Sequence, residues 1–363
     1  MRPDAPTRFT LLALLLIALA FPRDAAAVLI ASGDGTGNTT APPDDPGFAN
    51  VGLRDLQSAL YLGNRWVLTA NHVGFGNVVF EGVTYTAVTG SKVRIKNPDT
   101  TNADMQMFKL IETPPLPPLE ISASPPPIGS AVVLIGHGRN RGAATSYLGY
   151  DGWLWGAGHA MRWGTNTVAT PPAVFDTSWA FSTIFDPIAS GGTAQEAQAA
   201  IGDSGGGVFY QSGSVWRLVG VLYARDVHPG QPPETSLYGN TSFATDLATY
   251  RAQITATASQ PGCDDSLDDD ADLLTDFPAD PGCEDALDLW EQYGCADGID
   301  NDGDGQVDYP ADTGCSEAND HLELEPWPLP GLHPLGATAL VALLASLGSR
   351  SVTRRPAHCE SGE

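Results

Sequence analysis

The first 262 residues of this 363-residue chain contain no cysteine. No disulfide can therefore hold that part together, and its fold has to rest on a buried core. Positive charge is also scarce, because 18 Lys and Arg stand against 43 Asp and Glu and leave a net charge of −25. Such a chain repels phosphates, so we expect no nucleic-acid partner. A long apolar run is missing near the C-terminus, where residues 335–347 at about 1.5 Å each cannot cross a bilayer core of roughly 30 Å.

The shortage of positive charge is confined to one region. Residues 263–325 contain 22 acidic residues and no Lys or Arg, whereas residues 28–262 contain 17 acidic and 12 basic residues. The cysteines follow the same division and occur at Cys263, Cys283, Cys295, Cys315 and Cys359. The sequence therefore predicts a near-neutral domain over 28–258, an acidic region over 259–325 and a tail over 326–363.

The N-terminal 27 residues have the features of a secretory signal. Arg2 and Arg8 give a basic start, residues 11–21 form an apolar run, and residues 25–27 are three alanines suited to cleavage. The alternative is a buried first helix. Export predicts a secreted protein in an oxidising compartment, where cysteines can pair.

The C-terminal tail also has the features of a targeting signal, in a definite order. Residues 325–331 are proline-rich, the apolar run 335–347 follows, and Arg350, Arg354 and Arg355 come last. This order resembles bacterial sorting signals of the PEP-CTERM type, which implies transient membrane contact before the tail is cut or used as an anchor. The alternative is a short amphipathic or buried helix.

The near-neutral domain reads as short strands separated by turn residues, a pattern typical of a barrel or sandwich. A proline-rich stretch, 113–127, divides it into halves of about 85 and 135 residues. One helix is predicted where Phe243, Leu247, Tyr250 and Ile254 recur at helical spacing, with Ser242 as its cap. The clearest strand-like runs are 78–80, 85–88, 92–95, 105–110, 131–135, 208–210 and 216–223.

Three motifs occur in a fixed order in this domain. They are Trp-Val-Leu-Thr-Ala-Asn-His at 66–72, Asp-Met-Gln-Met-Phe-Lys-Leu at 104–110 and Gly-Asp-Ser-Gly-Gly-Gly at 202–207. In letters, order and spacing they resemble the three signatures of chymotrypsin-like (trypsin-superfamily) serine proteases. The resemblance implies an all-β fold of two antiparallel β-barrels with a C-terminal helix.

The same resemblance assigns a Ser-His-Asp triad. Ser204 would be the nucleophile, His72 the base that takes its proton, and Asp104 the carboxylate that orients the imidazole. Asp99 is a nearby rival to Asp104, but no apolar strand follows it directly. The amides of Gly202 and Ser204 would stabilise the oxyanion. The implied function is a secreted serine endopeptidase that cleaves protein or peptide substrates through an acyl-enzyme, with no cofactor for catalysis.

The sequence departs from the family pattern around the substrate. Val73 follows the histidine where a disulfide cysteine is common, and the specificity pocket would be built from Gln198, Tyr223 and Arg225. A preference for Lys or Arg is unsupported, because Gln198 stands where an Asp would be needed. Arg225 either favours an acidic side chain or blocks the pocket. The alternative function is a catalytically inactive protease-fold module that binds partners at the cell surface.

Activation also has a candidate route. In the family the residue matching Asp203 often pairs with a new α-ammonium group. Cleavage after Ala27 would free Val28, which lies 44 residues before His72. Signal cleavage could therefore produce the active form.

The acidic region is a repeat with an offset of 32 residues, bounded by cysteines at 263–283 and 295–315. Asp at alternate positions resembles the front half of an EF-hand loop, and the absence of Glu at the twelfth place, Ala311, makes it more similar to thrombospondin type 3 and dockerin-like loops. The resemblance implies Ca²⁺ binding; the alternative is a solvated acidic linker. Four cysteines allow three pairings, of which we expect pairing within each repeat, with Cys359 left over. The candidate calcium ligands are Asp300, Asp302, Asp304, Gln306 and Asp308 in the second copy, and Asp268, Asp270, Asp272 and Asp276 in the first.

Overall fold

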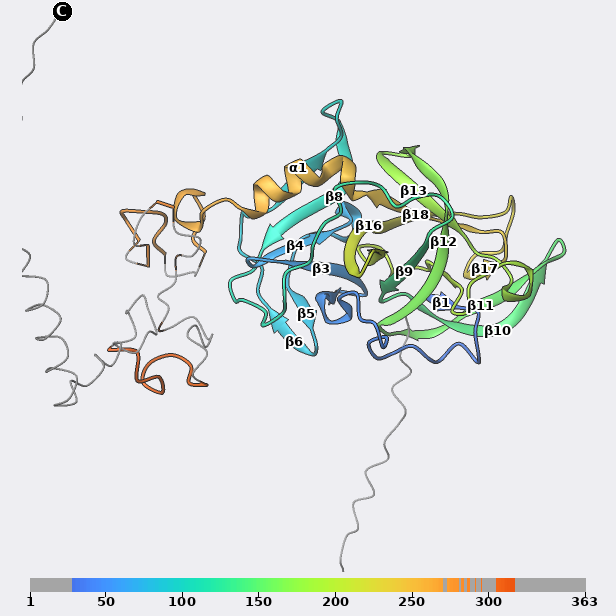
Figure 1. The fold of residues 1–363 in the computed structure, drawn as a ribbon, viewed down its shortest axis with the longest axis horizontal. Coiled ribbons are helices and arrows are strands. Elements are labelled where there is room, and N and C mark those ends of the chain that lie inside the picture. Colours follow the sequence, from blue (N-terminus) through green and yellow to red (C-terminus); the bar gives the residue numbers. More distant parts are fainter. Residues whose placement is uncertain are drawn as a thin grey trace, which may run out of the picture. The chain divides into compact units, whose positions relative to one another are not determined.

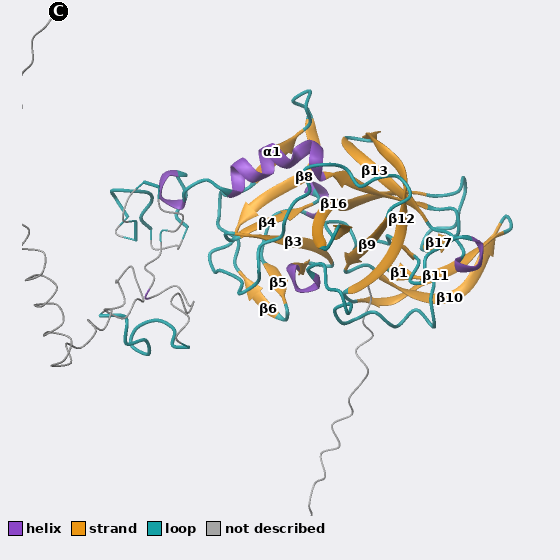
Figure 2. Cartoon of the chain, in the orientation of Figure 1, coloured by secondary structure: helices purple, strands orange, loops and turns teal. Residues whose placement is uncertain are grey.

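The computed structural model describes residues 28–269, 273–280, 282–283, 286–287, 291, 295 and 305–316. These residues are mostly β, as predicted, and contain eighteen strands and one α-helix (Figures 1 and 2). The predicted signal segment 1–27 and the predicted sorting tail 326–363 lie outside the described residues. No helix in the described part is both long enough and apolar enough to span a bilayer.

The first half of the β domain is a seven-stranded antiparallel sheet. A single bridge between Ala87 and Leu110 connects the continuation of its outer strand β6 to the end of β8. The prediction of a closed barrel is therefore not confirmed for this half, whose strands form a sheet joined at that bridge. In spatial order the strands are β6 (Val83–Tyr85), β5 (Val78–Phe80), β2 (Val51–Arg54), β3 (Gln57–Gly63), β4 (Trp66–Thr69), β8 (Asn102–Lys109) and β7 (Val93–Lys96).

The second half contains a closed six-stranded barrel, which confirms the prediction for that half. The proline-rich stretch 113–127 falls between β8 and the first barrel strand, as expected of a linker. Around the barrel the strands are β12 (Arg162–Phe175), β13 (Ser178–Ile184), β18 (Thr241–Asp246), β16 (Val215–Asp226), β15 (Gly207–Ser212) and β9 (Ala131–Gly136).

Two smaller sheets flank the barrel. One has the order β10 (Arg139–Tyr147), β11 (Tyr150–His159) and β17 (Thr235–Leu237). The other pairs β1 (Leu29–Ile30) with β14 (Ala197–Gln198). Short 3-10 turns occupy Phe48–Asn50, Asn71–Val73, Ile188–Ser190 and Gly262–Asp264.

The helix α1 spans Leu247–Ala258 and begins later than the sequence predicts. Phe243 belongs to β18, which pairs with both β13 and β16, so closure of the barrel decides its conformation over helical periodicity. The cap is Asp246 rather than Ser242, because the Asp246 side chain accepts hydrogen bonds from the Thr249 amide and hydroxyl. Tyr250 then anchors the helix by accepting a hydrogen bond from the Trp179 amide at 2.8 Å.

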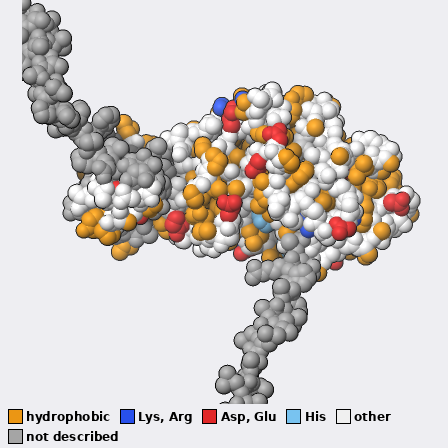
Figure 3. All heavy atoms as spheres, turned by 60° about the horizontal axis from the view of Figure 1, so that its bottom comes forward, with side chains coloured by type: hydrophobic (Ala, Val, Ile, Leu, Met, Phe, Trp, Pro, Cys, Tyr) orange, Lys and Arg blue, Asp and Glu red, His pale blue; other side chains and the backbone are white. Residues whose placement is uncertain are grey.

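One apolar cluster joins the two halves. It includes Leu68 and Met107 of the first sheet, Ile135 and Val221 of the barrel, and Ile254 of α1, all at most 1% exposed. Burial of this kind supplies the stabilisation that the cysteine-free domain requires. Figure 3 shows acidic side chains scattered over one face, in keeping with a net charge of −5 for residues 28–262.

The C-terminal region contains two disulfides. Cys295 and Cys315 pair with each other, as predicted for the second repeat, and Cys263 and Cys283 are also disulfide-bonded. The two repeats share backbone hydrogen bonds at the predicted offset of 32 residues. The Phe277 amide donates to Cys263 O and the Tyr309 amide to Cys295 O, at 3.1 and 3.0 Å. The predicted repeat is therefore a structural repeat as well.

The chain divides into two compact units, one of Met1–Asp280 with Asp285–Glu291, and one of Pro281–Glu284 with Gln292–Glu363. The first unit thus includes much of the first acidic repeat. A buried ionic cluster attaches this repeat to the β domain: Asp269, which is 0% exposed, accepts from Arg65 at 2.8 Å and also pairs with Lys109. Lys109 contacts Asp265 at 3.0 Å as well. Acidic residues that sequence alone assigns to a separate region therefore neutralise two buried cations of the β domain.

Candidate active site

The register of two strands brings His72 and Asp104 together. Strands β4 and β8 pair antiparallel with Thr69 opposite Gln106, so the turn after β4 lies beside the start of β8. His72 Nδ1 lies 2.6 Å from Asp104 Oδ2, and the His72 amide donates to Asp104 Oδ1 at 3.0 Å. This double contact fixes the orientation of the imidazole ring.

Hydrogen bonds keep Asp104 ionised. Partial burial favours its neutral form, but the hydrogen bonds and charge of His72 outweigh burial and hold the pKa of Asp104 below its ordinary value. The rival Asp99 instead accepts from the amide and hydroxyl of Thr101, within its own turn. Asp104 is thus the carboxylate that the fold places against His72.

The Ser204 loop is fastened to the sheet that positions His72. Ser58 of β3 donates its amide to Ser204 O at 2.8 Å and its hydroxyl to Gly202 O at 3.0 Å. The carbonyl of Ser58 accepts from Thr69 Oγ1 at 2.7 Å, at the end of β4. Gly205 has a φ of +85°, and a Cβ there would collide with the Ser58 carbonyl. Only glycine permits this close approach.

Two backbone amides in the loop remain available. Among the described residues, neither the Gly202 nor the Ser204 N–H donates to a protein acceptor, whereas the Gly205 and Gly206 amides donate to Leu222 O and Asp203 O. Unused donors beside a candidate nucleophile are what an oxyanion hole requires.

The Asp203 side chain stabilises the Ser204 loop by hydrogen bonds to two backbone amides. This side chain is 0% exposed and accepts from the amides of Gly138 and Ala200, both at 2.7 Å. Burial is the largest influence and raises the pKa of Asp203 to about 7, despite those two bonds and the charge of Arg162. A buried carboxyl of this kind favours a positively charged neighbour.

The N-terminal segment of the described chain pairs with the strand just before Ala200, whose amide donates to Asp203. Val28 is 0% exposed and packs in the barrel core with Ala199, while Leu29 pairs with Gln198. The segment that would begin the chain after the predicted signal cleavage, from Val28 on, is therefore packed inside the barrel half.

A pocket of about 290 Å³ opens beside Ser204. Of the three predicted specificity residues, Tyr223 and Arg225 line this pocket. Gln198 does not line it and is the residue just before Ala199, the first lining residue. Gln198 is 0% exposed, and neither polar atom of its side chain has a hydrogen-bond partner among the described residues. Tyr223 donates its hydroxyl to Phe175 O at 2.8 Å. The lining residues are Ala199, Ala200, Ile201, Ser204, Leu222, Tyr223, Ala224 and Arg225.

Three further histidines lie in the second half of the domain, and the rings of two of them have local partners. His159 Nδ1 lies 3.2 Å from His137 O, and His228 stacks on Tyr150 with a ring separation of 3.6 Å. Burial lowers the pKa of His137 to about 4, so it is neutral near pH 7. These contacts give His159 and His228 structural roles, whereas the buried Nδ1 of His137 has no hydrogen-bond partner among the described residues.

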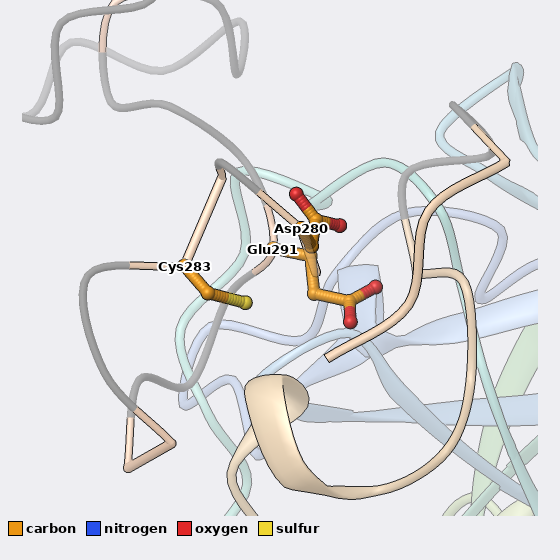
Figure 4. A group of neighbouring side chains, drawn as sticks. All are labelled: Asp280, Cys283 and Glu291. Atoms are coloured by element: carbon orange, nitrogen blue, oxygen red, sulfur yellow. The ribbon is translucent and has the colours of Figure 1, made fainter. Parts of the chain in front are cut away.

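Two buried acidic residues, one in the first repeat and one just after it, are not among the ligands that the motif predicts. Asp280 and Glu291 are 2% and 0% exposed, and their carboxylates lie within 4.8 Å of each other (Figure 4). Burial and the charges of Asp269 and Asp280 raise the pKa of Glu291 to about 7, although two backbone amides donate to it. Cys283, also drawn in Figure 4, is disulfide-bonded and unavailable as a ligand.

The second repeat has a matching residue. Asp312 is 2% exposed; its Oδ1 accepts from the Gly314 amide at 2.6 Å, and its Oδ2 has no hydrogen-bond partner among the described residues. Asp280 and Asp312 coincide at the 32-residue offset, one place after the position where an EF-hand has its Glu. A search for the terminal ligand one residue later would have found them.

The predicted ligands themselves are only partly described. Asp276 accepts from the amides of Asp265 and Ser266, and Asp268 Oδ2 accepts from the Leu273 amide. Gln306 and Asp308 are described in the second repeat. The remaining candidates, Asp270, Asp272, Asp300, Asp302 and Asp304, lie outside the described residues.

Comparison with known proteins places the site in a family context. The model of the family described as Trypsin matches residues 37–251, which contain His72, Asp104 and Ser204. No curated protein matches the chain. A crystal structure of Rv3671c from M. tuberculosis, a serine-to-alanine mutant in an inactive form, is 18% identical with a TM-score of 0.37, and covers 58% of this chain and 88% of that one. A structure titled Rv3671c protease, inactive form, is 17% identical with a TM-score of 0.35, at 57% and 87% coverage.

Proposed function

Because the chain belongs to the trypsin family of serine proteases, we propose that it is an exported serine endopeptidase whose triad is Ser204, His72 and Asp104. The observation that carries the proposal is the 2.6 Å contact between His72 Nδ1 and Asp104 Oδ2 in a family member with the Gly-Asp-Ser-Gly motif. Ser204 lines an open pocket, which gives a peptide access to it.

The proposed reaction uses only groups of this chain. His72 Nε2 takes the proton from Ser204 Oγ as that oxygen attacks the scissile carbonyl, while Asp104 stabilises the imidazolium. The amides of Gly202 and Ser204 bind the oxyanion, and His72 returns the proton to the leaving amine. In the second half of the reaction, His72 takes a proton from a water molecule as the water oxygen attacks the acyl carbonyl. His72 then returns the proton to Ser204 Oγ as the ester bond breaks and the carboxylic acid leaves.

Hydrolysis of a peptide library by the purified protein tests this proposal. We expect cleavage products, and we expect a fluorophosphonate, an inhibitor of serine hydrolases, to abolish their formation. A folded protein that cleaves no library member and no casein would instead support the alternative, a catalytically inactive binding module.

We also propose that both ends are processed during export. Cleavage after Ala27 would leave Val28 at the N-terminus, in a segment already packed beside the pocket wall. Its new ammonium group would be a suitable partner for Asp203, whose pKa of about 7 reflects a buried carboxyl without a full countercharge.

Protein recovered from its native host is expected to begin at Val28 and to lack residues after about Leu329. The reason is the order of basic start, apolar run and small residues at one end, and of prolines, apolar run and arginines at the other. Intact-mass measurement checks both ends at once. A mass that still includes Arg354 and Arg355 would refute the sorting-signal proposal.

The acidic repeats are proposed to bind Ca²⁺. Their described carboxylates fit a hard cation. Asp312 Oδ2 is buried and has no hydrogen-bond partner among the described residues, and the buried carboxylates of Asp280 and Glu291 lie within 4.8 Å of each other. Ca²⁺ would supply positive charge to carboxylates that otherwise repel one another by about 1 kcal/mol per adjacent pair in water. We add Asp280 and Asp312 to the predicted ligands.

Calorimetric titration of the full chain is expected to show Ca²⁺ binding well above Mg²⁺ binding, because Mg²⁺ requires a smaller octahedral site and loses water reluctantly. Asp302→Ala combined with Asp304→Ala should remove the tighter site, and Asp312→Asn should weaken it. Asp151→Asn, at an exposed position of β11, is the matched control. An absence of binding at millimolar Ca²⁺ would show that the repeats are a plain acidic spacer.

A further inference from the structure

The pocket beside Ser204 has a single charged side chain. Its walls are small and apolar at Ala199, Ala200, Leu222 and Ala224, and the charged group among the lining residues is Arg225. No Asp or Glu lines the pocket. The charge of Arg225 is therefore not neutralised within the pocket walls.

The Arg225 guanidinium is also poorly satisfied by the rest of the described chain. It has one hydrogen bond, from Nη1 to Thr235 O at 3.5 Å, and none of the ion pairs of the described residues includes it. Burial lowers the pKa of Arg225, and no nearby carboxylate offsets that effect. An arginine stays protonated in proteins, so the pocket wall has a half-buried positive charge and unused donors.

Two other arginines, one partly and one fully buried, show how this chain satisfies such a group elsewhere. Arg141 donates to the carbonyls of Ile30, Ala31 and Gly33 at 2.6–3.1 Å. Arg162 donates to Gly37 O at 2.8 Å and has further partners. Compared with Arg141 and Arg162, Arg225 makes fewer hydrogen bonds within the described chain, so its remaining donors are available to a ligand.

Arg225 is held in place while most of its donors stay unused. Its guanidinium lies 4.6 Å from the ring centre of Trp155, a cation–π distance. Trp155 is 8% exposed, and its indole N–H donates to Ser236 Oγ at 3.0 Å. The indole is thus a fixed platform, and the guanidinium is positioned before any substrate arrives.

We propose that this pocket selects an acidic side chain, glutamate or aspartate, on the residue whose carbonyl Ser204 attacks. The proposal rests on the proposed function, because it assigns the pocket to the substrate of Ser204. The aliphatic part of the side chain packs on the alanine walls, and its carboxylate pairs with Arg225. Arginine and carboxylate form charge-assisted, often bidentate hydrogen bonds that a neutral amide cannot match.

Matched peptides that differ only at the residue before the scissile bond test the proposal on the full chain. We expect kcat/KM for the Glu peptide to exceed that for the Gln peptide by about 10-fold or more, and that for Lys by a larger factor. Arg225→Gln should abolish the Glu-over-Gln preference, and Arg225→Lys should retain part of it. Arg217→Gln, which alters an arginine paired with Glu120 on the surface, is the control and should leave the preference unchanged.

Two results would overturn the proposal, and they differ from failure of the proposed function. Equal cleavage of Glu and Gln peptides by the wild type is one. The other is an Arg225→Ala variant that cleaves Leu peptides faster and Glu peptides no more slowly, because Arg225 would then be a block. In both cases fluorophosphonate would still label Ser204. Protein that is neither labelled nor hydrolytic would overturn the specificity and the protease function together.

Discussion

Ser204→Ala is expected to lower kcat/KM on casein or a cleavable peptide by about 10⁴–10⁶-fold, because no other group can form the acyl-enzyme. His72→Ala should cost nearly as much, since an unassisted serine hydroxyl is a poor nucleophile. The double variant should be little worse than either single one, because residues that act as one unit do not contribute additively.

The melting temperature separates loss of chemistry from loss of fold. Ser204 makes its described hydrogen bond through its carbonyl, which Ser204→Ala retains, so the variant should melt close to the wild type. Asp104→Asn is a useful companion, because it keeps the shape but changes the favoured imidazole tautomer. Activity of Ser204→Ala within tenfold of the wild type would show that Ser204 is not the nucleophile.

Asp269→Ala is expected to destabilise the protein by about 3–5 kcal/mol, the range found when one partner of a buried ion pair is removed. The change leaves Arg65 and Lys109 without their shared carboxylate, and these side chains are 0% and 2% exposed. For a domain of this size, each kcal/mol lowers the melting temperature by about 2–4 °C. Chemical denaturation followed by fluorescence measures the loss directly.

Asp264→Ala is the matched control for this prediction. It removes an exposed aspartate from the same segment, so its effect should stay within about 0.5 kcal/mol. If Asp269→Ala were equally mild, the first acidic repeat would not be an integral part of the protease unit.

Local sequence patterns predict much of this fold, because β-strands and the motifs that follow them are largely local features. The runs at 78–80, 131–135 and 208–210 all lie within strands, and the proline-rich segment separates the two sheets. The sequence also places His72 and Asp104 in motifs whose strands, β4 and β8, pair directly. Their contact therefore follows from one antiparallel register.

The features that sequence reasoning missed depend on contacts between distant residues. Whether the first sheet closes depends on the contact between residues 87 and 110, and Phe243 is a strand residue because two other strands pair with it. The Arg65–Asp269 pair joins residues 204 positions apart. No local period or motif encodes such pairs, and charge counting placed Asp269 in the acidic region over 259–325, apart from the β domain.

Centrally, we propose that Ser204 is the nucleophile, that His72 activates it by taking its proton, and that Asp104 orients the His72 imidazole. Fluorophosphonate labelling of the purified wild-type protein, with the modified peptide located by mass spectrometry, tests it most directly. We expect one label per chain on Ser204, no label on Ser204→Ala, and labelling of His72→Ala slowed by orders of magnitude. Folded wild-type protein that stays unlabelled, or that takes the label at another residue, would contradict it.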